Sequence, residues 1–222
     1  MDPLVYVLDL VVFIGIFSIV SLSLNLEFGF AGLANFGKVA FVLVGAYTYA
    51  ILSQVGVPFY LCLIVGASIS AIVGFLVSLP TLKLRADYLA IVFLTVGEIL
   101  RLIVKSEDWI GGGVWGMTVS PAISLAGISA RIDTFRLENI GLVFLCLLIC
   151  FVVTQLLSNS PYGRVMRAIR EDEVAAEALG KDRAKYRGQM LALGSAIAGL
   201  GGGLCAQYLQ FIDPYMFMPM LT

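Results

Sequence analysis

The chain has 222 residues, of which 60% are hydrophobic and 13% are charged, and its mean hydropathy is +0.98. An ordinary soluble domain carries about a quarter charged residues, so this composition excludes a conventional soluble core. A net charge of −1, from 14 Lys and Arg against 15 Asp and Glu, gives no field that would favour nucleic acid. Histidine is absent, which removes the commonest proton shuttle and metal ligand, and the sequence predicts no catalytic residue, metal or cofactor.

Continuous apolar runs approach the ~20 residues with which an α-helix crosses a hydrocarbon core. A β-barrel would instead need alternating segments of about 10 residues. We therefore predict an all-α membrane protein, a polytopic transmembrane bundle of about six helices in a single domain over residues 1–222. The predicted spans are 10–26, 28–52, 59–79, 88–104, 140–157 and 188–212. The acidic flank of the first span, Asp2 and Asp9, is the opposite of a signal peptide's basic region, so we expect this span to remain in the mature protein.

The second predicted span is interrupted near its start. The interrupting residues are Gly29, Gly32, Asn35, Gly37 and Lys38. Two interpretations fit. A helix broken at membrane depth survives only where protein or a water-filled cavity covers it, and such breaks often border substrate paths in transporters. Alternatively, the glycines let neighbouring helices approach closely. The segment either crosses fully, which puts the N-terminus outside, or re-enters, which puts it inside.

Basic residues in the polar loops predict the orientation. The loop 158–187 is expected in the cytoplasm because it carries seven basic residues. They are Arg164, Arg167, Arg170, Lys181, Arg183, Lys185 and Arg187. The loop 105–138 carries three basic residues against four acids and is expected to be extracytoplasmic. Lys83 and Arg85, two spans before 158–187, agree with this assignment. Trp109 and Trp115 flank a glycine cluster in the outer loop, as interfacial indoles would.

The charged segment 159–188 has the order of a helix. Ser160 is a typical N-cap and Pro161 suits the first helical position. Gly180 is placed to end the helix, and Glu177 precedes Lys181 by four residues, which favours an ion pair. We predict one or two short amphipathic helices between two spans. They are either a solvated connector or a handle that docks into a groove on a soluble partner.

Polar groups inside apolar stretches are the candidate translocation pathway, since such groups usually face the bundle interior or a cavity. The candidates are Asn25, Asn35, Tyr47, Thr95 and Glu98. Glu98 stands three residues before Arg101, so the two can instead simply pair. Small residues at Ser195, Gly199 and 201–203 predict a close helix-packing face on the last span.

Four blocks, taken together, resemble the permeases of ABC importers for branched-chain amino acids, the LivM and LivH group, with LivM the more similar. The blocks are Asn25–Leu52, Leu82–Leu102, Gly111–Gly113 and Gly163–Gly180. They occur in the family's order, and the last resembles the cytoplasmic coupling loop that docks on the ATPase. By position, the resemblance implies coupling roles for Arg164, Arg167, Ala168, Ile169, Glu173, Ala175, Ala176, Glu177 and Gly180.

The resemblance implies a transport subunit of the cytoplasmic (inner) membrane that is not itself an enzyme. Its implied partners are a second permease subunit, two ATP-hydrolysing subunits, an extracytoplasmic solute-binding protein and the lipid bilayer. The implied solutes are branched-chain amino acids or related small amides or urea. Members of the group usually continue for several spans beyond the position of Asp213, so we expect the C-terminal spans to be lacking here.

Two alternatives stay open from the residues alone. One is a channel or secondary transporter without ATPase partners, which the predicted coupling segment disfavours. The other is an intramembrane enzyme, for which Glu98 lacks a partner acid on its helix.

Overall fold

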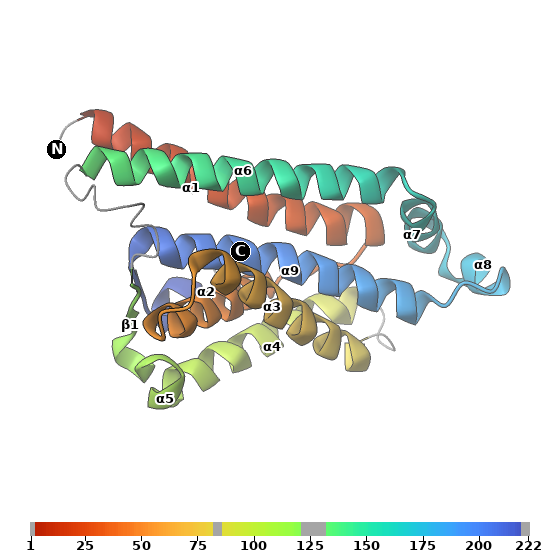
Figure 1. Ribbon diagram of the computed structural model, residues 1–222. Coiled ribbons are helices and arrows are strands. Elements are labelled where there is room, and N and C mark those ends of the chain that lie inside the picture. The colour runs from red at the N-terminus through yellow and green to blue at the C-terminus, as the bar shows by residue number, and fades with distance from the viewer. Residues whose placement is uncertain (1–2, 82–85, 121–131, 219–222) are drawn as a thin grey trace.

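A computed structural model describes residues 3–81, 86–120 and 132–218 of the chain (Figure 1). The long helices in chain order are α1 (Pro3–Leu24), α2 (Lys38–Gln54), α3 (Phe59–Thr81), α4 (Ala86–Ser106), α6 (Ile132–Asn159) and α9 (Arg183–Leu209). The short helices are a π-helix, η1 (Asn25–Phe30), then α5 (Asp108–Gly111), α7 (Pro161–Glu171), α8 (Glu173–Ala178) and two 3₁₀ turns, η2 (Gly113–Trp115) and η3 (Pro214–Phe217). Two-residue strands β1 (Met117–Thr118) and β2 (Phe211–Ile212) pair antiparallel. The all-α prediction is confirmed.

Among the described residues, four helical segments are long and apolar enough to cross a membrane. They are Leu4–Phe30, Phe59–Pro80, Arg136–Asn159 and Arg183–Leu209. Helix α2 has 17 residues, and α4 carries Glu98, Arg101 and Lys105, so neither belongs to this set. The count of about six crossings stays a prediction. Lys83 and Arg85, used for the orientation, lie outside the described residues.

Helix α9 is the centre of the bundle and packs against α2, α3 and α1. The predicted packing face on α9 is confirmed, because its glycines lie directly against neighbouring backbones. A Cβ at Gly199 would meet the Ser70 side chain and then the carbonyl oxygen of Gly66, both on α3. A Cβ at Gly202 would meet the carbonyl oxygen of Val42 on α2. Within lipid there is no hydrophobic drive between helices, so this close contact of small residues is what holds them together.

Helices α1 and α6 lie side by side along one edge of the molecule (Figure 1). Near their first turns, Arg136 forms an ion pair with Asp9, and the hydroxyl of Tyr208, at the end of α9, donates to the same carboxylate. Because α7 follows the last residue of α6, the N-terminal end of α1 is opposite to α7 and α8, as Figure 1 also shows.

The predicted interruption between residues 28 and 52 is a break between two helices. The last turns of the α1 segment widen into η1, and the chain leaves helical geometry after Ala31. Gly32 has a φ of +66°, in the left-handed region that favours glycine. The chain then turns back and re-enters helix at Lys38. Helix α2 ends beside β1, since the Gln54 side chain donates to the Thr118 carbonyl at 2.9 Å.

The end of the molecule that carries the N-terminus is closed by the β1–β2 pair. It joins Met117 to Ile212 and Thr118 to Phe211, and so connects the segment after α4 to the end of α9. Trp109 and Trp115 stand out from this end, with 81% and 87% of their surfaces exposed. Indoles so placed suit the interface between water and lipid.

Candidate functional site

Helix α7 begins as the sequence predicts. The Ser160 hydroxyl accepts a hydrogen bond from the Gly163 amide at 3.3 Å, and Pro161 occupies the first helical position. Met166 and Ile169 are fully buried on the inward face, while Arg164 and Arg167 lie on the exposed face. The apolar stripe on one side of α7 therefore fixes which side meets the bundle.

Helix α8 follows at once, because Asp172 caps it. The Asp172 carboxylate accepts from the amides of Val174 and Ala175 at 2.9 and 3.0 Å. The helix ends before Gly180, whose φ of +76° confirms the predicted stop. The coupling segment, which we define as Pro161–Gly180, is thus two short helices separated at Asp172 rather than one continuous helix (Figure 1).

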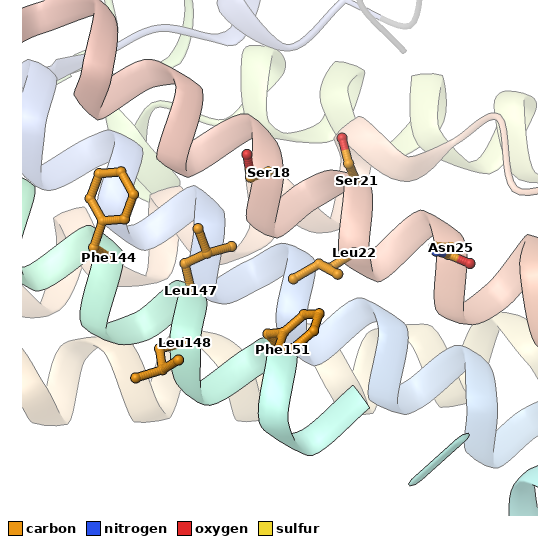
Figure 2. Close-up of a pocket in the computed structure, with 8 residues that line it drawn as sticks. All are labelled: Ser18, Ser21, Leu22, Asn25, Phe144, Leu147, Leu148 and Phe151. Carbon is orange, nitrogen blue, oxygen red and sulfur yellow. The ribbon is translucent and has the colours of Figure 1, made fainter. Parts of the chain in front are cut away.

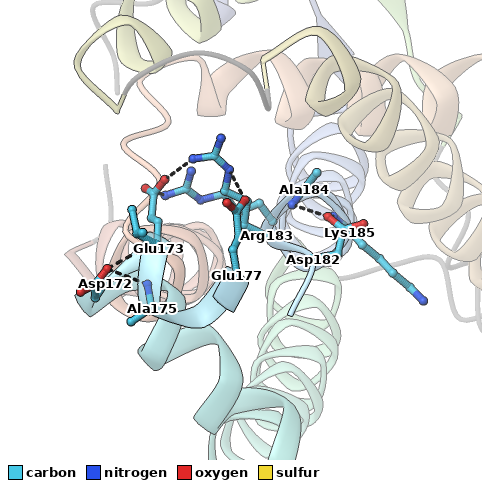
Figure 3. A network of polar contacts seen from close by, with 10 residues as sticks. Asp172, Glu173, Ala175, Glu177, Asp182, Arg183, Ala184 and Lys185 are labelled. Carbon is cyan, nitrogen blue, oxygen red and sulfur yellow. Dashed lines mark hydrogen bonds and ion pairs between the residues drawn. The ribbon is translucent and has the colours of Figure 1, made fainter. Parts of the chain in front are cut away.

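A network of ion pairs fastens α8 to the start of α9 (Figure 3). Glu173 pairs with Arg183 at 2.7 Å and with Arg187, and Arg183 also reaches Glu177 at 2.8 Å. The expected pair of Glu177 with Lys181 is wrong. Helix α8 stops at Ala178, so Lys181 does not continue its surface, and Arg183 takes the place of Lys181.

The Glu173 carboxyl has a perturbed pKa. Burial acts to raise it, but hydrogen bonds from Arg183 and Arg187 outweigh burial and hold the pKa of Glu173 below its usual value. Arg187 lies in the first turns of α9 and is only 5% exposed, so the network extends from the surface of α8 to a buried side chain of α9. Glu173 is therefore ionised at neutral pH and holds α8 against α9.

The predicted coupling residues divide by exposure. Ile169 and Ala176 are buried, and Glu173 is half-buried in the network. Those on the surface are Arg164, Arg167, Ala168, Ala175, Glu177 and Gly180. Two apolar residues that were not predicted, Val174 and Leu179, are also on this surface, with 77% and 81% of their area exposed. The result is a small apolar face on α8 surrounded by charge.

A second polar cluster lies at the helix break and is fully buried. Glu27, in η1, forms an ion pair with Lys38, the first residue of α2, at 2.5 Å, and both side chains are 0% exposed. The Asn35 amide donates to the other Glu27 oxygen at 2.8 Å and accepts from the Gly37 amide at 3.1 Å. The cluster thus holds the two sides of the break together.

The predicted pathway residues do not converge on one place. Asn35 is in the buried cluster at the break, and Asn25 lies in a groove between α1 and α6 (Figure 2). Tyr47 is buried against Phe217, with ring centroids 6.3 Å apart. Thr95 is exposed on α4, where its hydroxyl donates to the Ile91 carbonyl. Glu98 accepts from Arg101 at 2.9 Å, the pairing that the spacing suggested.

The groove between α1 and α6 has a cavity volume of about 530 Å³ and mixed chemistry. Figure 2 shows its walls. Helix α1 and the start of η1 contribute Ser18, Ser21, Leu22 and Asn25, and α6 contributes Phe144, Leu147, Leu148 and Phe151. The groove therefore presents its polar atoms from one side only.

The sequence did not predict the pairing of Glu27 with Lys38. It also did not predict that Arg170 contacts the helix break, where its guanidinium donates to the Gly29 carbonyl. A signal existed for Glu27, which is the one acid between Asp9 and Asp87 in a chain that is otherwise apolar there. Intramembrane ionisable residues are functional candidates by default. Among the described residues there is no group of three or more His, Cys, Asp or Glu placed to hold a metal ion.

The chain is similar to known transport proteins over nearly its whole length. A family model described as "branched-chain amino acid transport system / permease component" matches residues 6–222. The high-affinity branched-chain amino acid transport permease LivM of Salmonella typhimurium is 36% identical over 224 residues, which cover 91% of this chain and 52% of that protein. A Methanocaldococcus jannaschii protein named as a probable LivM permease is 36% identical over 228 residues, covering 87% of this chain and 65% of its own length.

A more distant relative is the M. jannaschii protein named as a probable LivH permease, at 26% identity over 210 residues, 92% of this chain and 66% of that protein. The chain spans about half to two thirds of the length of these curated relatives. No solved structure matches. With a family match that begins at residue 6 and runs to the last residue, the chain belongs to the branched-chain amino acid transport permeases and is of the LivM type.

Proposed function

We propose that this chain is a membrane-spanning permease subunit of an ABC importer that moves branched-chain amino acids, or related small amides or urea, into the cytoplasm. Partner subunits hydrolyse the ATP, a second permease completes the pathway, and an extracytoplasmic binding protein delivers the solute. The family membership supports transport of this class. The geometry of the coupling segment supports the ATPase-driven form of transport.

The observation that carries the proposal is the face of α8. Val174 and Leu179 expose most of their apolar surface next to the small side chains of Ala175 and Ala178. A short helix with such a face suits docking into a groove on a soluble partner. Its ion pairs with Arg183 and Arg187 give that partner a rigid connection to α9, the central helix.

The proposed orientation places the coupling segment in the cytoplasm, following its basic residues. The N-terminal end of α1 and the β1–β2 pair are at the opposite end of the bundle. We therefore propose an extracytoplasmic N-terminus, with the segment 28–52 crossing to the outer side through α2. The test is the variant Leu4→Cys in sealed right-side-out vesicles, treated with a thiol reagent that does not cross membranes. We expect the new cysteine to be labelled, and protection from the reagent contradicts the assignment.

The test of coupling is Glu177→Arg in complexes that contain the ATPase. We expect uptake of radiolabelled leucine to be lost while membrane insertion is retained, because the change reverses the charge beside the docking face and breaks the pair with Arg183. Lys185→Glu is the matched control, since it reverses an exposed charge on the next helix. Unchanged uptake in Glu177→Arg contradicts the coupling role.

Purification from native membranes tests the class of transporter. An ABC permease should co-purify with an ATPase in mild detergent. Isolation of the chain without any ATPase would favour a channel or a secondary transporter.

A further inference from the structure

A polar contact joins helix α7 to the helix break. The Arg170 guanidinium donates a hydrogen bond from Nη1 to the carbonyl oxygen of Gly29, in η1. Carbonyls in the last turn of a helix lack an intrahelical donor, and a basic side chain can supply one. Arg170 therefore satisfies the backbone at the point where the first helix segment ends.

The backbone after η1 is fitted around the same arginine. A Cβ at Gly32 would meet the Cγ of Arg170 at 3.0 Å, and the φ of Gly32 is +66°. Glycine is thus required at position 32 for two reasons, the backbone conformation and the space that the Arg170 side chain occupies. The contact of α7 with the break is more than the end of one flexible side chain.

An apolar contact lies beneath the arginine. Met166, the buried residue one turn before Arg170 on α7, belongs to one buried cluster with Leu26, Ala31 and Leu33 from the two sides of the break. Met190 and Leu191 of α9 belong to it as well. Helix α7, the break and α9 therefore share one core, and in a close-packed core a shift of one member displaces the others.

Glu27 lies in the same six-residue π-helix as Gly29. Its carboxylate binds Lys38 and Asn35, and a Cβ at Gly194 of α9 would overlap the Glu27 side chain. The Ser23 hydroxyl, one turn earlier, donates to the Gly194 carbonyl oxygen. Any displacement of η1 therefore acts on the ion pair that closes the break and on α9.

We propose that Arg170 is a positioning residue that links the coupling segment to the helix break, so that the position of α7 sets the geometry of the Glu27–Lys38 cluster. This inference rests on the proposed function, because it assumes that the coupling segment moves and that this movement is transmitted first to the helix break. The contact of Arg170 is also a second connection between the coupling segment and the membrane-spanning helices, besides the ion pairs of α8. The α8 network acts on the start of α9, whereas Arg170 acts on the end of the first helix segment.

The test is hydrogen–deuterium exchange of the full 222-residue chain in lipid nanodiscs. In Arg170→Ala, we expect amide exchange within residues 25–37 to increase about tenfold, since hydrogen bonds from charged donors change local opening equilibria by at least that factor. Exchange within α3 should not change. Arg170→Lys keeps the charge but loses the guanidinium fork, and it should give an intermediate increase.

Glu171→Gln is the matched control on the same helix, because Glu171 is exposed and adjacent. Wild-type exchange in residues 25–37 of Arg170→Ala, or an equal increase in Glu171→Gln, would overturn the link. If Arg170→Ala does not insert into the membrane, exchange in residues 25–37 of Arg170→Lys is compared with wild type and with Glu171→Gln in the same way.

A second measurement separates a link from a static anchor. In assembled complexes, Arg170→Ala should lose leucine uptake while ATP hydrolysis continues, with partial recovery in Arg170→Lys. Uptake per ATP equal to wild type overturns the positioning role. The exchange result needs no ATPase, so it stands or fails separately from the proposed function, whose own test is Glu177→Arg.

Discussion

Both charged clusters of this chain pair carboxylates with basic side chains, but the two clusters lie in opposite surroundings. Glu27 and Lys38 are both 0% exposed. In the network at α8, the side chains of Glu173, Arg183 and Glu177 are between 33% and 48% exposed, and Arg187 is buried. In a buried ion pair, water cannot take the place of a lost side chain, so removal of either residue leaves the other with an uncompensated charge. An exposed network is screened by solvent and salt, and its loss is mild. The first cluster is therefore suited to fix a backbone conformation, and the second to hold α8 against α9 at the surface of the molecule.

The largest effect is expected from Lys38→Met. It leaves Glu27 without its counter-charge in a site closed to water, and the free energy of unfolding should fall by about 3–5 kcal/mol. The measurement is reversible unfolding in mixed micelles with increasing sodium dodecyl sulfate. The matched control is the double variant Glu27→Gln with Lys38→Met, which removes both charges and should recover much of the loss. Equal losses in the single and double variants would mean that the charge itself is unimportant.

An intermediate effect is expected from Glu173 and depends on pH. The folded-state pKa of Glu173 lies below the ordinary value of 4.5, so its contribution is present above about pH 4.5 and is lost as pH falls through the folded value. At pH 7, Glu173→Gln should lower the free energy of unfolding by about 1 kcal/mol, because partial exposure weakens these charged hydrogen bonds. The difference between wild type and Glu173→Gln should shrink as pH falls below about 4.5 and vanish once pH is below the folded-state pKa. A difference that persists there would assign the effect to packing.

The smallest effect on stability is expected from Glu177→Gln. The pair with Arg183 is the most exposed of the network, and its loss should change the free energy of unfolding by no more than about 0.5 kcal/mol. The same unfolding titration checks this value. A loss as large as that of Lys38→Met would remove the contrast between the two clusters.

The local signals in the sequence predicted local structure well. Ser160 and Pro161 start α7, Gly180 stops α8, and the glycines between residues 29 and 37 mark a real break in the helix. Each of these features depends on a backbone preference of the residue itself. Such preferences can be read without knowing what lies nearby.

Contacts between distant segments were not predictable in the same way. Lys38 was interpreted as an interruption of a span, and its partner Glu27 is in a different helix. The link from Arg170 to Gly29 joins residues 141 positions apart. Arg183 replaced Lys181 as the partner of Glu177 because the chain turns after α8. The candidate pathway residues were chosen for polarity alone, and polarity does not specify a common location. They lie in different parts of the bundle.

The β1–β2 pair gives the opposite end of the bundle a different kind of fastening. It consists of main-chain hydrogen bonds, joined by the Gln54 amide on the Thr118 carbonyl, and involves no ionised group. The coupling-segment end is fastened largely by carboxylate–guanidinium pairs. Raising the salt concentration should therefore loosen α8 from α9 before it loosens the β1–β2 pair.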